Sequence, residues 1–386
     1  MIEIDGQTGE GGGQLVRIAV ALASVACKPV RITNVRGNRP GGHGGGLKSQ
    51  HVTAIEWLAQ ATNAKVKGLE VGSKTLEFSP DHGPGGLPER QIQITAASPA
   101  ASALLIFQAV LPFLLFAGNA RNEPVELTIS GGTNVSFSLS YEYLDQVLLP
   151  TLETWFGIRV ERRLDGRGWS TGRATRGSLW FQIHPLPMGN TLKIKDGLTD
   201  NYRKVNDDLE VGSIEITVIA PSDLHAPLGT RLREDLEALF PDTQLNFRQP
   251  EESGHEAHCL YSGKRKGKKV DVLCREVSRS VSKDLASEIH RGGLVDEFLQ
   301  DQLVVFQALT EGSTSFPRSF ADSRLSLSKR HSQVKKDRCR GPIGDSNSDS
   351  SHTQTARWVA WEILEPKLTW FNKGTVCEAV GFESGC

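Results

Sequence analysis

The chain has 386 residues, of which 38% are hydrophobic and 23% are charged, with a formal net charge of −1 at pH 7. This length allows one large domain or two unequal ones, and the near-neutral charge excludes a protein that binds nucleic acid through a generally basic surface. Six cysteines lack CxxC spacing and favour reduced thiols in a cytosolic or nuclear protein. The most apolar run, 103–117, is shorter than the roughly 20 residues of a membrane span. We therefore expect a buried helix there and no membrane segment.

The first predicted strand covers 2–4 and precedes a glycine-rich turn, 8–14, and a predicted helix over 15–26. Glycines let backbone N–H groups approach a ligand, and the helix start adds a partial positive charge. Arg17 lies close to the glycines, and Arg36 and Arg39 follow the next predicted strand, 29–35. This pattern indicates a polyphosphate pocket, although a tight turn with a solvated basic rim fits it equally well. Neither GxGxxG nor GxxxxGK[ST] occurs, so a nucleotide site here is of another type.

The following elements predict a repeated unit. A helix over 47–62 and strands within 69–78 and 91–95 complete a β-α-β-α-β-β pattern. The pattern recurs as a helix over 99–116, a strand over 125–129, a helix over 139–156, and strands over 158–162 and 179–183. The sequence therefore predicts an α/β (α+β) fold, with a large domain built from repeated β-α-β-α-β-β units.

A smaller α/β domain is predicted at 187–271, inserted between a first part of the large domain, 1–186, and a last part, 272–386. After a polar stretch it has a predicted strand over 214–219, a helix over 230–240 and a strand over 244–247. Its end carries a basic cluster, 264–269, which could hold RNA phosphates or direct nuclear import. A solvated hairpin tip is the more common explanation of such a cluster.

The last part of the chain alternates helical patterns with a polar segment. Helices are predicted over 277–288, 295–309 and 354–364. Between the last two, residues 313–351 are rich in serine, arginine, lysine and aspartate and lack apolar periodicity. Such a composition predicts a disordered polar insertion.

Six short motifs stand in order along the chain: GEGGGQLVR at 9–17, VRGNR at 35–39, LKSQHV at 47–52, SGGTN at 130–134, DEFLQDQLVVF at 296–306 and HTQTA at 352–356. Together they resemble the RNA 3′-terminal phosphate cyclase family, and the last two are more similar to its eukaryotic than to its bacterial form. The resemblance implies a large domain of repeated units, with a smaller α/β domain inserted between the third and fourth units.

The resemblance implies that His352 is the nucleophile. An imidazole can attack the α-phosphorus of ATP and form a phosphoramidate that remains reactive enough to pass AMP onward. AMP would then move to an RNA 3′-phosphate, and the vicinal 2′-hydroxyl would close a 2′,3′-cyclic phosphate and expel AMP. The predicted activity is that of an ATP-dependent RNA 3′-terminal-phosphate cyclase of the ligase class.

Further site residues are implied by the same resemblance. Glu10 is the candidate ligand of Mg²⁺ or Mn²⁺, which would neutralise the triphosphate; a turn-capping role is the alternative. Phosphate groups of ATP or the RNA end would be held by Arg17, Arg36, Arg39 and Gln50. The nucleotide would be contacted by Gln108, Phe298, Asp301, Gln302 and His352. Phe298 stands where the family usually has tyrosine, so a hydroxyl contact is replaced by aromatic packing alone.

The alternative function is a catalytically inactive, cyclase-like protein in ribosomal RNA processing and ribosome assembly. Inactive members lack the histidine, so His352 and Glu10 favour the enzyme, whereas Phe298 and the polar insertion mildly favour the alternative. The basic cluster and the eukaryotic-like motifs indicate the nucleus, either nucleoplasm or nucleolus, with the cytoplasm as second choice. The sequence predicts no oligomeric state.

Overall fold

The computed structural model describes residues 1–39, 45–99, 101–136, 138–169, 176–195, 211–253, 258–259, 263–264, 269–318, 350–371 and 374–386. The chain divides into two compact units: a main unit, Met1–Leu198 with Leu294–Cys386, and an inserted unit, Thr199–Gly293. None of the described helices is long and apolar enough to cross a membrane.

The main unit repeats one topology. The first repeat comprises β1 (Ile2–Asp5), α1 (Gly13–Ala26), β2 (Val30–Thr33), α2 (Ser49–Ala61), β3 (Lys65–Lys67) and β4 (Leu76–Ser79). Its strands are ordered β1-β2-β4-β3, with β1 and β2 parallel and the other pairs antiparallel. A short 3₁₀ turn, η1 (Pro84–Gly86), leads to the second repeat.

The second repeat follows the same scheme, with strand order β5-β6-β8-β7 and only the β5–β6 pair parallel. It comprises β5 (Gln91–Thr95), α3 (Ala103–Leu115), β6 (Val125–Gly131), α4 (Tyr141–Tyr143), the π-helical turn η2 (Leu144–Leu148), α5 (Leu149–Phe156), β7 (Arg159–Gly166) and β8 (Gly177–His184). The predicted α/β (α+β) fold is therefore confirmed.

A third repeat begins at Leu192, which bridges Thr310 in the parallel direction, as β1 pairs with β2. It continues with α9 (Glu297–Leu309), β15 (Gly312–Ser315), α11 (Ser351–Leu364), β16 (Leu368–Phe371) and β17 (Val376–Ala379), in the order β15-β17-β16. The inserted unit therefore interrupts the third repeat between its first strand and its first helix. The expected position, between a third and a fourth unit, is wrong.

Two predicted elements of the first half are corrected. The strand at 91–95 is β5, which opens the second sheet instead of closing the first; β3 takes that place in the first repeat. β3 was not predicted from sequence because it is a three-residue edge strand with two exposed lysines. The helix predicted over 139–156 is interrupted by η2, because Pro150 has no N–H to donate to an α-helical hydrogen bond.

The predicted polar insertion, 313–351, is partly corrected. Its first residues, 313–315, belong to β15 because their backbone pairs with β17. Its last residue is the first residue of α11. Residues 319–349 lie outside the described part of the chain.

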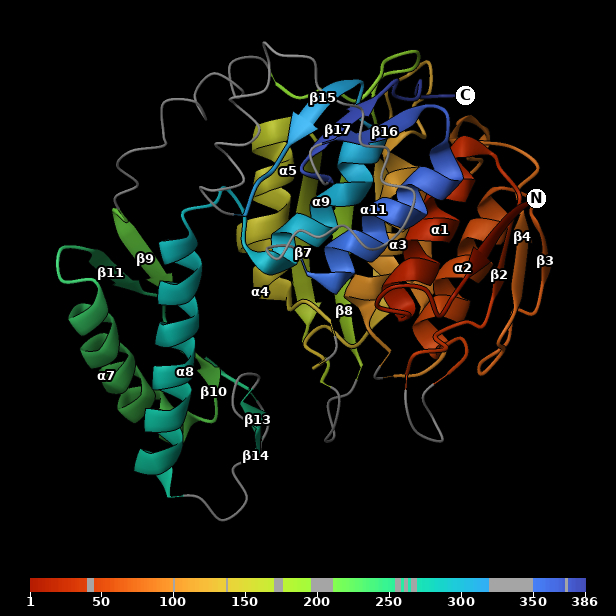
Figure 1. Ribbon diagram of the computed structural model, residues 1–386. Helices are drawn as coiled ribbons and strands as arrows, with labels where there is room; N and C mark the ends of the chain where they lie inside the picture. The colour runs from red at the N-terminus through yellow and green to blue at the C-terminus, as the bar shows by residue number, and fades with distance from the viewer. Residues whose placement is uncertain are drawn as a thin grey trace, which may run out of the picture. The chain divides into compact units, whose positions relative to one another are not determined.

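The helices of the main unit pack around one hydrophobic core. Figure 1 shows α9, α11, α1 and α3 side by side, and α1 contacts both α3 and α11. Eleven residues of α1 are buried, so this helix is covered on nearly all sides. As a result, side chains from distant parts of the sequence meet around the N-terminal half of α1.

The inserted unit has its own core, formed by leucines of α7 together with Leu273 and Val277 of α8. Its elements are β9 (Ser213–Ile216), β10 (Ile219–Ala220), α7 (Ser222–Leu239), β11 (Gln244–Phe247), β12 (Glu251–Glu252), β13 (His258–Cys259), β14 (Gly263–Lys264) and α8 (Val270–Arg291). Because α8 packs on α7, the unit extends to Gly293, beyond the expected limit of 271. Of the basic cluster, residues 265–268 lie outside the described residues.

Candidate active site

The glycine-rich turn approaches both α2 and α11. A Cβ at Gly11, where φ is +59°, would lie 2.6 Å from the Asn38 side chain, and one at Gly13 would lie 2.5 Å from Nε2 of His51. The backbone N–H of Glu10 donates to Oγ1 of Thr355 in α11 at 2.8 Å. Glycine is therefore needed for these close approaches, and one hydrogen bond ties the turn to α11.

His352 is the second residue of α11, and its imidazole faces this turn. Nδ1 lies 3.1 Å from Oε1 of Gln14, and Nε2 lies 3.9 Å from Oε1 of Glu10. Burial lowers the pKa of His352, and the nearby guanidinium groups of Arg39 and Arg17 lower it further, against a smaller opposite effect of Glu297. The imidazole is therefore neutral near pH 7, the state that can act as a nucleophile. With the side chain 45% exposed, a ligand can still reach it.

Glu10 has a carboxylate that is only 6% exposed. Its Oε1 forms an ion pair with Arg39, and neither oxygen accepts a hydrogen bond within the described part of the chain. Mg²⁺ is commonly held by one or two carboxylates together with substrate phosphates and water. Glu10 fits that kind of site, whereas the described residues contain no cluster of three or more His, Cys, Asp or Glu side chains that could hold a metal by themselves.

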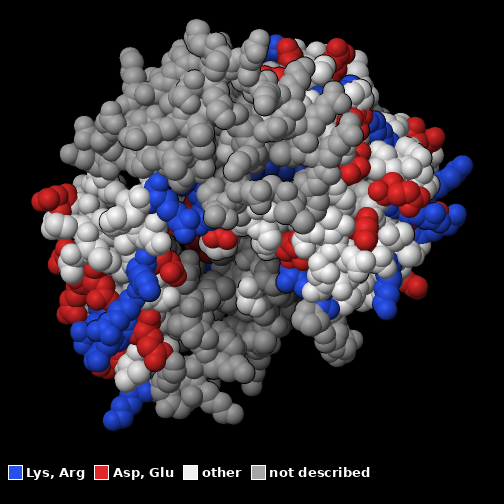
Figure 2. Space-filling model, in the orientation of Figure 1, with Lys and Arg blue, Asp and Glu red and all other residues white. Residues whose placement is uncertain are grey.

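Basic side chains gather around the buried imidazole of His51, which is 2% exposed. Burial holds the pKa of His51 well below its usual range, and Arg17, Arg36 and Lys48 lower it further. Gln50, also predicted at this site, is half-buried in the first turn of α2. On the face drawn in Figure 2, by contrast, described basic and acidic side chains are interspersed. The concentration of positive charge suits a phosphate-rich ligand.

Three of the predicted nucleotide contacts meet in a pocket between α1, α3 and α9. Gln108 donates from Nε2 to Oε1 of Gln302, and Gln302 donates from Nε2 to Oδ1 of Asp301. Burial raises the pKa of Asp301 to about 7, although Gln302, Arg17 and Gln14 favour its ionised form. Burial also lowers the pKa of Arg17 to about 10. Apolar side chains, among them Phe107, Leu111 and Val305, line the pocket together with these polar groups, a combination that suits a nucleotide base.

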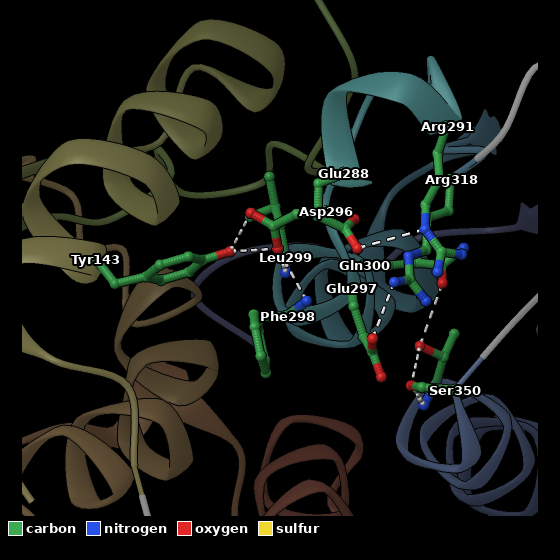
Figure 3. Close-up of polar contacts among 11 residues, drawn as sticks. Tyr143, Glu288, Arg291, Asp296, Glu297, Phe298, Leu299, Gln300, Arg318 and Ser350 are labelled. Atoms are coloured by element: carbon green, nitrogen blue, oxygen red, sulfur yellow. Dashed lines mark hydrogen bonds and ion pairs between the residues drawn. The ribbon is translucent and has the colours of Figure 1, made fainter. Parts of the chain in front are cut away.

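Phe298, another predicted nucleotide contact, is 65% exposed and, like His352, is not among the residues that line this pocket. It packs edge-on against Tyr143, with ring centroids 6.4 Å apart (Figure 3). Beside it, Asp296 caps α9 by accepting the N–H groups of Phe298 and Leu299, each at 2.8 Å, and it also accepts the Tyr143 hydroxyl.

Three buried polar residues of this site had no role predicted from sequence: Gln14, His51 and Thr355. Each lies in a quoted motif, but their contacts depend on how the helices pack. Gln14 and His352, for example, are 338 positions apart. A polar residue on an otherwise apolar helix was the available signal for Gln14.

The sequence profile of the RNA 3′-terminal phosphate cyclases matches residues 8–367. The chain belongs to this family. Three relatives, each called RNA 3′-terminal phosphate cyclase, illustrate the similarity. The protein from Methanosarcina mazei is 35% identical over 331 residues, covering 82% of this chain and 89% of the relative. That from Methanosarcina barkeri is 32% identical over 368 residues, covering 95% and 96%. That from Drosophila melanogaster is 29% identical over 333 residues, covering 82% and 85%.

Proposed function

We propose that this protein uses ATP to convert an RNA 3′-terminal phosphate to a 2′,3′-cyclic phosphate through a histidine-AMP intermediate. The observation that carries the proposal is the placement of His352. Its imidazole is held at Nδ1 by Gln14, and its Nε2 faces Glu10 and the cationic side of the site. Membership of the cyclase family supports the choice of ATP and RNA as substrates.

In the first step, Nε2 of His352 attacks the α-phosphorus of ATP. An N–P bond forms while the bond from the α-phosphorus to its bridging oxygen breaks, and pyrophosphate leaves. Arg17, Arg36 and Arg39 stabilise the negative charge of the phosphates, since guanidinium groups match phosphate oxygens bidentately. Gln108, Asp301 and Gln302 contact the base in the neighbouring pocket.

Glu10 would hold a divalent metal, Mg²⁺ or Mn²⁺, together with phosphate oxygens. Its buried carboxylate, which accepts no hydrogen bond from the described residues, fits this role. When bound, such an ion would neutralise part of the triphosphate charge. The ion pair with Arg39 keeps the carboxylate compensated in the free protein.

The next two steps use the RNA end. An oxygen of the RNA 3′-phosphate attacks the phosphorus on His352, the P–N bond breaks, and AMP is joined to the RNA through a new phosphoanhydride. The vicinal 2′-hydroxyl then attacks the terminal RNA phosphorus and loses its proton to water. The 2′-oxygen–phosphorus bond forms as AMP leaves, so one ATP is consumed for each cyclic phosphate.

The experiment that tests this function follows a 3′-phosphorylated oligoribonucleotide incubated with ATP, Mg²⁺ and purified protein. We expect wild type to give a phosphatase-resistant cyclic end and His352→Ala to give none. The control is His290→Ala, which changes an exposed histidine of α8 in the inserted unit. If folded wild-type protein yields no cyclic end with either Mg²⁺ or Mn²⁺, the proposal fails, and a non-catalytic role in ribosome assembly becomes the better one.

We also propose a nuclear location, with the basic cluster 264–269 as the import signal. Support comes from the sequence of the cluster, which has five basic residues among six. Replacing these five by glutamine in a fluorescent fusion is expected to shift the protein to the cytoplasm. An unchanged nuclear signal would contradict this proposal.

A further inference from the structure

Two buried polar side chains, Gln14 and Asp301, link His352 to the nucleotide pocket. Gln14 is 6% exposed and Asp301 is 9% exposed. Gln14 faces Nδ1 of His352 with its Oε1 atom at 3.1 Å, and the same side chain interacts with the carboxyl group of Asp301, whose ionised form it favours. We propose that Asp301 and Gln14 are positioning residues that keep the proton of His352 on Nδ1, so that Nε2 is the attacking atom. The inference rests on the proposed function, because it assigns a role in adenylation.

The tautomer follows from which groups can donate. An ionised carboxylate only accepts hydrogen bonds, so Gln14 must turn its amide NH₂ group toward Asp301. Its oxygen then faces His352, and Nδ1 must carry the proton in order to donate to it. In a neutral imidazole protonated at Nδ1, the lone pair lies on Nε2. Nε2 is the atom that faces Glu10, at 3.9 Å from its Oε1.

The Asp301 carboxylate, toward which the amide of Gln14 turns, is also the end point of a series of amide hydrogen bonds from α3 and α9. Gln108 donates to Gln302, and Gln302 donates to Asp301 from the side of α9. With the tautomer inferred here, Gln14 of α1 donates to Asp301 and accepts from His352 of α11. Four helices therefore contribute to the orientation of one imidazole, and the series of hydrogen bonds connects the nucleotide pocket to the nucleophile.

This series of hydrogen bonds also predicts how the rate of adenylation responds to pH. Asp301 faces Arg17 of α1, which favours its ionised form, and Asp296 at the start of α9, which opposes it. Because the pKa of Asp301 is about 7, a large fraction of the carboxyl becomes protonated just below that pH. A protonated Asp301 can donate to the Gln14 oxygen, so the amide is free to turn over and the proton of His352 to move to Nε2. Adenylation by wild type is expected to fall below about pH 7, and Asp301→Asn to lose this step.

The test reads the tautomer of His352 in the free protein. Protein with ¹⁵N-labelled histidine is studied at about pH 8 by long-range ¹H–¹⁵N NMR, with His352→Ala assigning the signal. We expect an Nδ1–H pattern in wild type, a mixture or an Nε2–H pattern in Gln14→Leu, and the wild-type pattern in Gln14→Glu, which keeps an acceptor at Nδ1. Gln307→Leu is the matched control, because Gln307 is equally buried but bonds to Thr314. An Nε2–H pattern in wild type, or an unchanged pattern in folded Gln14→Leu, overturns the inference.

A kinetic readout separates positioning from binding. Gln14→Leu is expected to reduce the rate of adenylation at saturating ATP roughly 10- to 100-fold, the cost of a lost hydrogen bond to a reacting group. The KM for ATP should change far less, and a loss confined to KM would contradict the inference. Since the NMR pattern is read without ATP, it tests the inference even if the protein forms no adenylate, which would refute only the proposed function.

Discussion

The starts of α1 and α9 occupy equivalent places in the first and third repeats, but their chemistry is opposite. The residue before α1 is Gly12, which has no side chain, and the first turn of α1 contains no acidic residue. The residue before α9 is Asp296, whose carboxylate accepts two backbone N–H groups, and Glu297 follows it (Figure 3). Helix starts attract anions. At α9 the carboxylate of Asp296 accepts the free N–H groups of the helix start. No described side chain caps α1, so its first N–H groups remain available to a phosphate.

This difference shows how a repeated fold acquires a single site. Each repeat supplies a first helix, and the caps decide what the start of that helix can bind. The start of α3 is also capped by a side chain, because Oγ of Ser102 accepts the N–H of Leu105. Only α1, of these three helices, begins without a side-chain cap. His352, Glu10 and the arginines are gathered around that end.

The largest expected effect comes from giving α1 the kind of cap that α9 has. Gly12→Asp places a carboxylate where we propose that phosphate binds, and it should reduce ATP-dependent adenylation by about 100-fold or more, from lost charge-assisted hydrogen bonds. Gly12→Asn is the control, since it has the shape of aspartate without the charge; in both variants the new Cβ would lie against Oε2 of Glu10, so that carboxylate must shift equally. Equal losses in the two variants would mean that the absence of charge at this position is unimportant.

The different environments of Asp296 and Asp301 provide the next test. Asp296 accepts two backbone N–H groups of the helix start, whereas Asp301, about one turn later, is buried and has a folded-state pKa of about 7, above its ordinary value of 3.8. Folding therefore favours the protonated form of Asp301, and its contribution to stability falls as pH rises from about 4 to about 7. Asp301→Asn should raise the free energy of unfolding at about pH 8 by on the order of 3 kcal/mol and slow adenylation. Urea unfolding of both proteins at about pH 4 and about pH 8 measures the difference in the free energy of unfolding. An equal gain at the two pH values would contradict this explanation.

Removing the side-chain cap of α9 should affect the free energy of unfolding more than the rate of adenylation. Asp296→Ala removes the cap and is expected to lower the free energy of unfolding by about 1–2 kcal/mol, with little change in adenylation. Tyr143→Phe is the companion variant, because it keeps the cap and the ring and removes only the hydroxyl that donates to Asp296. If Asp296→Ala strongly increased the affinity for ATP, the starts of α1 and α9 would be functionally alike. That result would contradict the assignment of phosphate binding to α1 alone.

The smallest effect concerns the hydrogen bond that ties the glycine-rich turn to α11. Thr355→Val removes the acceptor of the Glu10 N–H while keeping the shape of the side chain. We expect a loss of roughly 1 kcal/mol, or about five-fold in the adenylation rate. Thr310→Val is the control, because Thr310 is a buried threonine at the end of α9 whose hydroxyl bonds only within its own helix. A similar loss in both variants would indicate general destabilisation.

The parts of the fold that were predicted from sequence are those with a local signal. The glycine-rich turn, α1 and β5 were visible as turn chemistry and apolar periodicity. The assignment of β5 to the second sheet was not, because the short strand β3 has two exposed lysines and no clear alternation. The limit of the inserted unit was also missed, since only the packing of α8 on α7 decides it.

The candidate site shows the same division. The basic and acidic residues stood in recognisable motifs, so their proximity could be anticipated from the family resemblance. The roles of Gln14 and Thr355 could not, because each depends on a single contact between α11 and a segment more than 300 positions away. Such contacts leave no periodic or compositional trace in the sequence.

The central claim is that Nε2 of His352 becomes bonded to AMP. The most direct measurement incubates folded wild-type protein with α-labelled ATP and a divalent metal, digests it, and locates the adduct by mass spectrometry and ³¹P NMR. We expect an acid-labile phosphoramidate on Nε2 of His352 and no adduct in His352→Ala. An adduct on another residue or on Nδ1, or no adduct on well-folded wild type, would contradict the account.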